Sequence, residues 1–379
     1  MQRLQHNGFD IHFSELSDPR ISRSKLYPLI EILFVVLCGS ICGAESWRDF
    51  VLFGKEKIDL LREYYPFKNG IASKDTFARV FAVLNPEEFK SCFVTWVKSL
   101  QTALNDIIAI DGKTLRGSVD MQNGTSAIHM VSAFATGARL VLAQQKVADK
   151  SNEITAIPLL LNLLSLKGNI ITIDAMGTQK AIAKQIHDAG GFYVLALKGN
   201  QGTLNEDVRL FLESEIKKNT PLLIEDIHED LDKGHGRIET RTCVVSSHID
   251  WLIQKSDWAG LKTIAMIEEQ CDIKGKLTTE QRFFISNLPP KAQLIAGAVR
   301  SHWMVENNLH WTLDVVFNED LSRVHKEHAG ENMAIVRHIV LNMLNQAKSA
   351  FKGVGLKALR KKAGWGNNTL SYILKQSLT

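Results

Sequence analysis

Two short runs of β-branched residues each lead into an aspartate, and these runs constrain the fold more than any other feature. The first is Ile107–Asp111, followed by Gly112, and the second is Asn169–Asp174. Short apolar runs bounded by turn residues predict buried strands. An acid at the last position of such a strand lies at the sheet rim, where ligands bind in open α/β sheets. Two such strands can bring two carboxylates together, although both aspartates could instead be unrelated turn formers or helix caps.

The composition is that of a globular protein and limits the partners that need to be considered. The 379 residues are enough for two or three domains with ample core. A net charge of +4 permits nucleic-acid binding without requiring it. Five scattered cysteines without a CxxC pair predict reduced thiols in a cytoplasmic protein and no zinc site. The N-terminus lacks the apolar core of a signal peptide, and the interrupted apolar run 26–44 predicts a buried helix rather than a membrane span.

Residues 1–100 predict a helical N-terminal domain. Pro28 is a plausible helix start, and Ala44–Arg62 has the apolar side of an amphipathic segment. Two compact helices follow, one capped by Ser73 and one beginning after Asn85. Their short connection is similar to a DNA-binding helix-turn-helix, but plain helical packing explains it equally, because the stretch is not especially basic.

From Asp106 onwards the pattern changes to strands that alternate with helices. The predicted order is three strands, helix, strand, helix, strand and helix, with the two aspartates on the first and fourth strands. The predicted strands are 107–111, 127–134, 139–147, 169–174 and 192–197, and the predicted helices span 151–164, 178–189 and 205–216. An insertion at about 217–290 follows, with predicted strands at 237–246, 261–268 and 281–286.

Helical periodicity returns over residues 291–317. Four ionisable residues there, His302, Glu306, His310 and Asp314, are each four apart, which predicts one shared helical face. The row could be a surface of i,i+4 polar pairs or a transition-metal site, although HExxH and its relatives are absent. Four ionisable groups in one row, flanked by Arg300, Asn307 and Trp311, are unusual for a merely solvated face and favour a functional role.

The last segment, residues 351–379, predicts a basic helical tail. Its cations are either a solvated face or a patch that contacts phosphates. The basic run consists of Lys352, Lys357, Arg360, Lys361 and Lys362, with Trp365 after it.

Six phrases of the sequence carry a family resemblance when they are taken together. They are Ile110–Ser118, Ile173–Ala175, Lys198–Gln201, His235–Glu239, His302–Asn307 and His310–Val315. Each is weak alone, but together they resemble bacterial insertion-sequence transposases of the DDE class. Within that class the chain looks most like the H-repeat-associated proteins that sit beside Rhs elements, and the likeness extends over nearly the whole chain.

The resemblance implies a mixed α/β (α+β) fold. Residues 101–350 would form a ribonuclease-H-like domain with a β-rich insertion, and strands one and four of its sheet would be neighbours. By position, Asp111, Asp174 and Glu306 would be the catalytic residues and the metal ligands. Three carboxylates can hold two Mg²⁺ ions, or Mn²⁺ in their place, and two close carboxylates require such a cation or a shared proton.

The resemblance also implies contacts with DNA. Many family members with such an insertion carry Tyr, Arg and Lys around the glutamate, but His302 and Leu313 stand at two of those positions here, so other residues must contact the DNA. His302 and Asn307 are expected beside Glu306, supporting it without binding metal. The residues expected to meet DNA are Lys113, Arg116, Lys198, Arg237, Arg300 and His310.

The implied activity is metal-dependent DNA cleavage at insertion-sequence ends, followed by strand transfer into target DNA. The expected partner is double-stranded DNA, bound by a homodimer in the cytoplasm at the nucleoid, with no membrane involved. Two alternatives stay open: a catalytically inactive transposon-derived DNA-binding protein, and a metal-dependent DNA nuclease.

Overall fold

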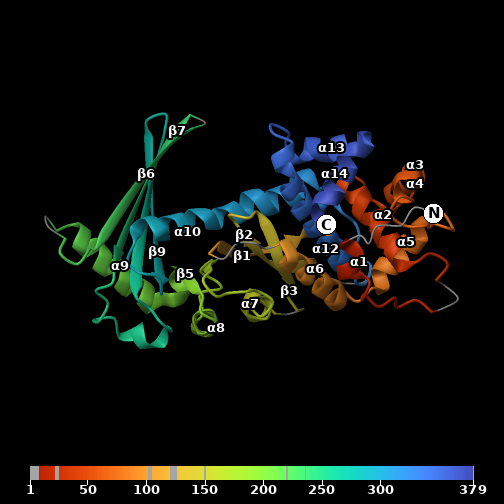
Figure 1. Cartoon of the computed structure of the whole chain (residues 1–379). Helices are drawn as coiled ribbons and strands as arrows, with labels where there is room; N and C mark the ends of the chain where they lie inside the picture. Colours follow the sequence, from red (N-terminus) through yellow and green to blue (C-terminus); the bar gives the residue numbers. More distant parts are fainter. Residues whose placement is uncertain are drawn as a thin grey trace.

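A nine-stranded mixed sheet with helices on both faces organises the chain (Figure 1). The computed structural model describes residues 8–21, 25–100, 105–119, 126–148, 151–218, 221–234 and 236–378. His235, part of one of the six phrases, lies outside this range. Among the described residues, no helix is long and apolar enough to cross a membrane.

Among the described residues, six α-helices precede the first strand. Side-chain caps explain where three of them begin: Ser46 and Asp49 form a capping box, Ser73 caps a second helix, and Asn85 accepts backbone N–H bonds at the start of a third. The helices are α1 Gly8–Phe13, α2 Leu29–Ile41, α3 Trp47–Glu56, α4 Ile58–Leu61, α5 Lys74–Val83 and α6 Pro86–Leu100.

The helix pair α5 and α6 packs into the interior. Phe89, Phe93 and Trp96 of α6 are buried, and the helix packs against β3. These contacts favour helical packing over an exposed recognition helix.

The first five strands have the arrangement expected of a ribonuclease-H-like domain, and the predicted fold class is confirmed. The sheet order begins β3-β2-β1-β4-β5, in which β1 pairs in parallel with β4, and β4 with β5. The bounds are β1 Ile107–Leu115, η2 Arg116–Ser118, β2 Ile128–Ala135, β3 Leu140–Lys146, α7 Glu153–Leu161, β4 Ile170–Ile173, α8 Lys180–Asp188, β5 Phe192–Leu197, η3 Gly199–Gln201 and α9 Gly202–Ile216.

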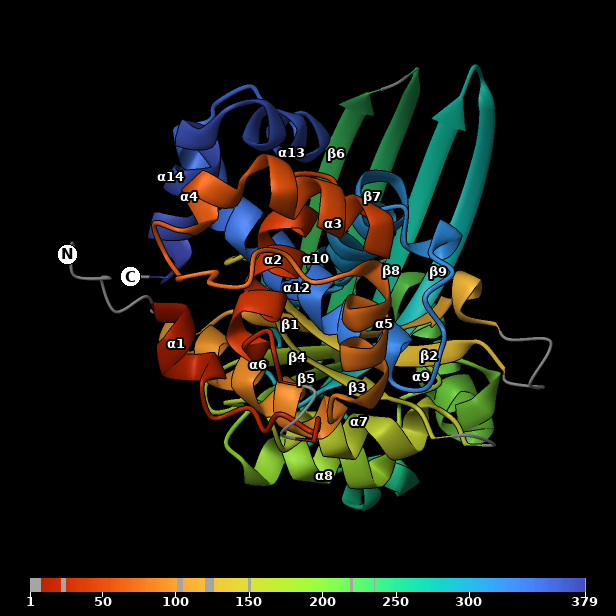
Figure 2. The same cartoon turned by 90° about the vertical axis from the view of Figure 1, so that its right-hand side faces the viewer.

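The β-rich insertion extends the same sheet. Its last strand, β9, pairs antiparallel with β5, and the order continues as β9-β8-β7-β6. The outer parts of β6 and β9 are exposed, and the two hairpins project beyond the body of the molecule (Figure 2). The bounds are β6 Asp226–Gly234, β7 Arg237–Ser246, η4 Ile253–Asp257, β8 Thr263–Ile273 and β9 Lys276–Ser286; the sequence pattern gave no indication of β6.

One long helical stretch then crosses the sheet. It begins with α10, which packs on β1, β4, β5 and the insertion strands, whereas α7 and α8 cover the opposite face (Figure 1). The bounds are α10 Ala292–Val305, the π-helical turn η5 Glu306–His310, α11 Trp311–Val316, η6 Glu319–Leu321, α12 Ala329–Ala347, η7 Lys348–Ala350, α13 Leu356–Trp365 and α14 Asn367–Leu378.

Helix α12 is the centre of the helical part. It is buried along nearly its whole length, and it packs against α2, α5, α6, α14 and β3. The N-terminal helices and the C-terminal helices therefore share one core. Polar residues of α12 satisfy backbone groups elsewhere: Asn332 donates to the carbonyls of Phe81 and Leu84, and the Asn342 amide bonds both backbone groups of Val141.

We expect Asn342→Ala to destabilise the protein by about 2–4 kcal/mol, because it leaves the buried N–H and C=O of Val141 without partners. The matched control is Asn345→Ala on the same helix, where a partly exposed amide donates to the Arg139 carbonyl and its loss should reduce stability by less than about 1 kcal/mol. Urea unfolding of both variants measures the difference. Equal losses would show that Asn342 does not anchor strand β3.

Candidate active site

The two aspartates come from neighbouring strands. Strand β1 runs parallel to β4, with Ile110 opposite Ile173. Asp111 follows Ile110 in the sequence and Asp174 follows Ile173, so the two aspartates come next to each other. Asp111 does not end its strand as predicted. Strand β1 continues to Leu115, because its pairing with β2 extends past the point where β4 stops, and this pairing outweighs the turn preference of Gly112.

Glu306 reaches this region from the helix that crosses the sheet. Helix α10 packs on β1 and β4, and Glu306 follows its last residue. Glu306 opens the π-helical turn, in which the Trp311 N–H donates to the Glu306 carbonyl. Three of the four residues in the predicted row contact the sheet: His302 lies against Thr172 of β4, and His310 and Asp314 lie against Asp111 and Lys113 of β1. π turns of this kind are frequent at functional sites.

Asp111 lies in a cluster of negative charge. Burial, and in smaller part the nearby carboxylates of Glu153, Asp174 and Glu306, raise its pKa to about 7, against a lowering contribution from the Gly112 N–H. The three acids singled out by the sequence are thus close enough to interact. Over the described residues, however, no three His, Cys, Asp or Glu side chains gather closely enough to hold a metal ion.

Glu153 is a fourth carboxylate, which the sequence pattern did not reveal. It begins α7, and its Oε1 lies 2.7 Å from Nε2 of His129, whose Nδ1 lies 2.8 Å from the Thr114 hydroxyl. A Cβ at Gly112 would stand 2.1 Å from that Glu153 oxygen and 2.8 Å from the His129 ring. Gly112, which has no side chain, therefore leaves room for Glu153 and His129. The glycine itself is the one sequence signal that relates to Glu153, because it marks a place where other groups approach the backbone closely.

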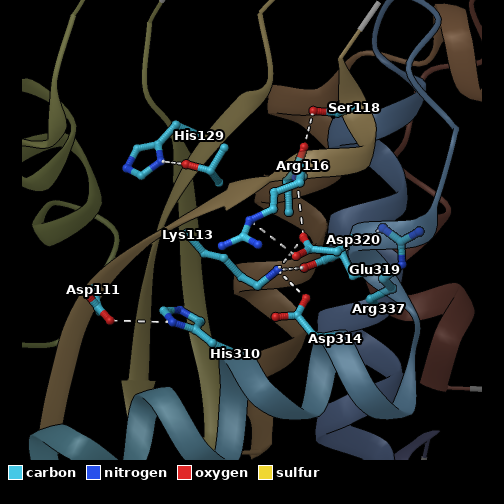
Figure 3. A network of polar contacts seen from close by, with 12 residues as sticks. Asp111, Lys113, Arg116, Ser118, His129, His310, Asp314, Glu319, Asp320 and Arg337 are labelled. Atoms are coloured by element: carbon cyan, nitrogen blue, oxygen red, sulfur yellow. Dashed lines mark hydrogen bonds and ion pairs between the residues drawn. The ribbon is translucent and has the colours of Figure 1, made fainter.

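His302 and His310 both lie inside the site. His310 Nδ1 is 3.5 Å from Asp111 Oδ2, and burial lowers the pKa of His310 to about 4 (Figure 3). The side chain is 12% exposed and lies against Asp111, so the contact of His310 with DNA stays a prediction. His302 Nδ1 lies 3.0 Å from the Thr172 hydroxyl of β4, and burial lowers its pKa as well.

Lys113 is enclosed by carboxylates, and its contact with DNA stays a prediction. Its ammonium is 11% exposed and lies 2.7 Å from Asp314, 3.2 Å from Glu319 and 3.3 Å from Asp320 (Figure 3). These carboxylates raise its pKa despite burial, which acts in the opposite direction. Arg337 completes the group by pairing with Glu319. We call Lys113 and its three carboxylates the lysine clasp; it ties β1 to the segment that follows Glu306.

The other cations predicted to meet DNA differ in solvent exposure and in whether a carboxylate neutralises them. Arg116 is 83% exposed, and its nearest carboxylate, Asp320, is 3.7 Å away. Lys198 is exposed at the end of β5. Arg237 and Arg300 are each paired with a carboxylate of the insertion, at 2.6 Å to Glu239 and 2.9 Å to Asp232.

A groove of about 900 Å³ lies between the insertion strands and α10, next to Glu306. Its charges are mixed, with arginines facing carboxylates of the same strands. The Arg282 guanidinium lies over the Trp303 ring, 4.9 Å from its centre, and the indole is 47% exposed. Asn307, predicted beside Glu306, also lines this groove, and its amide is 3.4 Å from the Trp303 carbonyl.

Comparison with known families accounts for nearly the whole chain. Residues 102–343 match the model described as "Transposase DDE domain", and residues 11–97 match "DDE_Tnp_1-associated". The chain is 41% identical over 372 residues to the "H repeat-associated putative transposase YhhI" of Escherichia coli (strain K12), covering 97% of each chain. It is also 41% identical over 69 residues to "Inactive transposase YbfQ" of the same strain, covering 18% of this chain and 82% of that protein.

A solved structure of a piggyBac transposase synaptic complex with hairpin DNA is similar at a TM-score of 0.42. The identity is 11%, and the match covers 97% of this chain and 77% of that one. A likeness this distant supports no conclusion about the site.

We expect Lys113→Met to destabilise the protein by about 3 kcal/mol, because three carboxylates lose their shared cation at a largely buried position. Arg116→Met, three residues along the chain, is the control; its exposed guanidinium should contribute less than about 1 kcal/mol. Thermal and urea unfolding at neutral pH compare the two. A loss at Lys113 no larger than at Arg116 would refute the clasp.

Proposed function

The chain belongs to the family of proteins with a transposase DDE domain, and we propose that it cuts DNA at the ends of an insertion sequence and joins them to target DNA. The observation that supports this most is that Asp111, Asp174 and Glu306, which come from three distant segments, interact at one end of the β1–β4 pair. Oxygen ligands of this kind suit hard divalent cations.

The carboxylates fit a pair of Mg²⁺ or Mn²⁺ ions in chemistry and charge. Asp111, Asp174 and Glu306 would hold the ions, and Glu153 adds a fourth carboxylate beside them. Burial first, and the mutual repulsion of the carboxylates second, raise the pKa of Asp111, and a bound cation would relieve both. Such ions, when bound, activate the attacking oxygen and stabilise the leaving oxygen of a phosphodiester.

The neighbouring side chains would orient this centre. His310 and His302 are kept neutral by burial, so each can hold a partner by hydrogen bonding without adding positive charge beside the acids. Thr172 fixes His302 on the β4 side, and the lysine clasp fixes the β1 side. Arg116, which follows β1, and Lys198, which follows β5, are exposed cations that would meet DNA phosphates.

A DNA-binding role without catalysis is the second candidate. It is favoured by the absence, among the described residues, of a ready-made group of three metal ligands. Holding an ion would require the site carboxylates to draw closer together. A metal-dependent nuclease without strand transfer is a variant of the enzymatic function, and a strand-transfer assay with target DNA separates the two.

Glu306→Gln tests the enzymatic function, because it keeps the shape of the side chain and removes its charge. We expect Mg²⁺-dependent cleavage of DNA carrying the element ends to fall by roughly 100-fold or more, since metal stabilisation of developing charge supplies several kcal/mol. Metal-free DNA affinity should hold or rise slightly, because a repelling charge is gone.

The control for this experiment is Glu63→Gln, an exposed glutamate of the N-terminal region that should leave cleavage unchanged. Equal cleavage by wild type and Glu306→Gln would remove Glu306 from the site. DNA binding by the wild type without any cleavage under Mg²⁺ or Mn²⁺ would instead favour the non-catalytic role.

A further inference from the structure

The positive charge of the chain is concentrated at one end. Residues 351–379 contain six Lys and Arg and no Asp or Glu, whereas residues 1–350 contain 39 Lys and Arg against 41 Asp and Glu. The whole positive excess therefore lies in the last 29 residues. Such asymmetry is typical of a segment that binds a polyanion.

Three of these six cations are exposed on one helix, α13. Arg360 is buried and donates to the carbonyls of Ser40 and Val316, so it anchors α13 to the body. Lys357, Lys361 and Lys362 are exposed on the same helix. We call these three lysines, together with Trp365 at the end of the helix, the α13 face.

The lysines of the α13 face lack carboxylate partners. Among the described residues, no Asp or Glu lies within ion-pair distance of Lys357, Lys361 or Lys362, and the Lys362 ammonium instead lies 5.1 Å from the centre of the Phe351 ring. Lys357 and Lys361 are also four apart, a like-charged spacing that disfavours a helix by about 0.2–0.5 kcal/mol. Arg237 and Arg300, in contrast, are neutralised by neighbouring carboxylates.

Trp365 distinguishes this surface from an ordinary solvated helix. Its side chain is 81% exposed beside the lysines, although an indole is among the most favourable groups to remove from water. Lys57, whose ammonium donates to Asn367, adds a further cation close to the end of α13. Cations next to an exposed aromatic ring are the combination that contacts the phosphates and sugars or bases of nucleic acid.

We propose that the α13 face binds the sugar–phosphate backbone of double-stranded DNA, independently of sequence and of metal. This inference rests on the proposed function and adds where the DNA is held. The catalytic carboxylates repel phosphate until cations bind, so attraction for DNA must come from another surface. Uncompensated lysines supply it by displacing the counterions that surround DNA.

The test compares two matched double variants in the full chain. Lys357→Gln with Lys361→Gln removes an i,i+4 pair from α13, and Lys180→Gln with Lys184→Gln removes an i,i+4 pair from α8, which lies on the opposite side of the molecule (Figures 1 and 2). Binding of a labelled mixed-sequence DNA duplex is measured without divalent metal over a range of salt concentrations. All four lysines are exposed, so unfolding midpoints should barely change.

We expect the slope of log affinity against log salt to become shallower by roughly 2 for the α13 variant, because each lost phosphate contact contributes about 0.9. The α8 variant should keep the wild-type slope. Equal slopes for all three proteins would overturn the inference and leave the α13 face to another partner, such as an acidic protein. If the wild type does not bind DNA even at low salt, the proposed function itself fails.

Trp365→Phe gives a second readout that does not depend on charge. If DNA covers the α13 face, part of the tryptophan quenching on DNA binding in the wild type should be absent in the variant. Quenching of equal amplitude in both proteins would place the DNA elsewhere and overturn the inference.

Discussion

The parallel pairing of β1 with β4 is the constraint on which the rest of the structure depends. It sets Asp111 beside Asp174, an arrangement that like charges oppose; burial, and in smaller part the neighbouring carboxylates, raise the pKa of Asp111 to about 7. The strands are held in this register by apolar residues that α10 covers on one face and α7 and α8 cover on the other. Hydrophobic burial over many residues thus maintains a local electrostatic strain that no single contact could hold.

Three consecutive residues of β1 each contact a different part of the site. Asp111 meets His310, Gly112 leaves room for Glu153, and Lys113 enters the lysine clasp. Successive residues of a strand point to opposite faces, so this short segment is tied to α7 on one side and to the helix after Glu306 on the other. A change at any of the three would therefore alter how two separate elements approach the carboxylates.

The sequence was sufficient where local pattern and tertiary pairing agreed, as in strand 192–197, whose predicted bounds match the structure. Predictions from the sequence differed from the structure where contacts with residues distant in the chain decided the local conformation or pairing. Gly112 and the residues around it predict a turn, but β1 continues past Gly112 because it pairs with β2. Lys113 reads as a free cation because its carboxylates lie some 200 residues away, at separations of 201 to 207 in the chain. Glu153 carries no local pattern at all.

These failures share a physical cause that bears on how such a chain meets DNA. A lysine or arginine close to a cluster of acidic residues readily forms structural ion pairs, as Lys113 does, and removing one partner of a buried pair is strongly destabilising. Cations that remain available for a polyanion must therefore be segregated from acidic residues, both in sequence and in space. Residues 351–379, which lack any Asp or Glu, meet this condition in the sequence, and α13 meets it on the surface. An acidic centre that must attract an acidic substrate requires this separation of charge within one molecule.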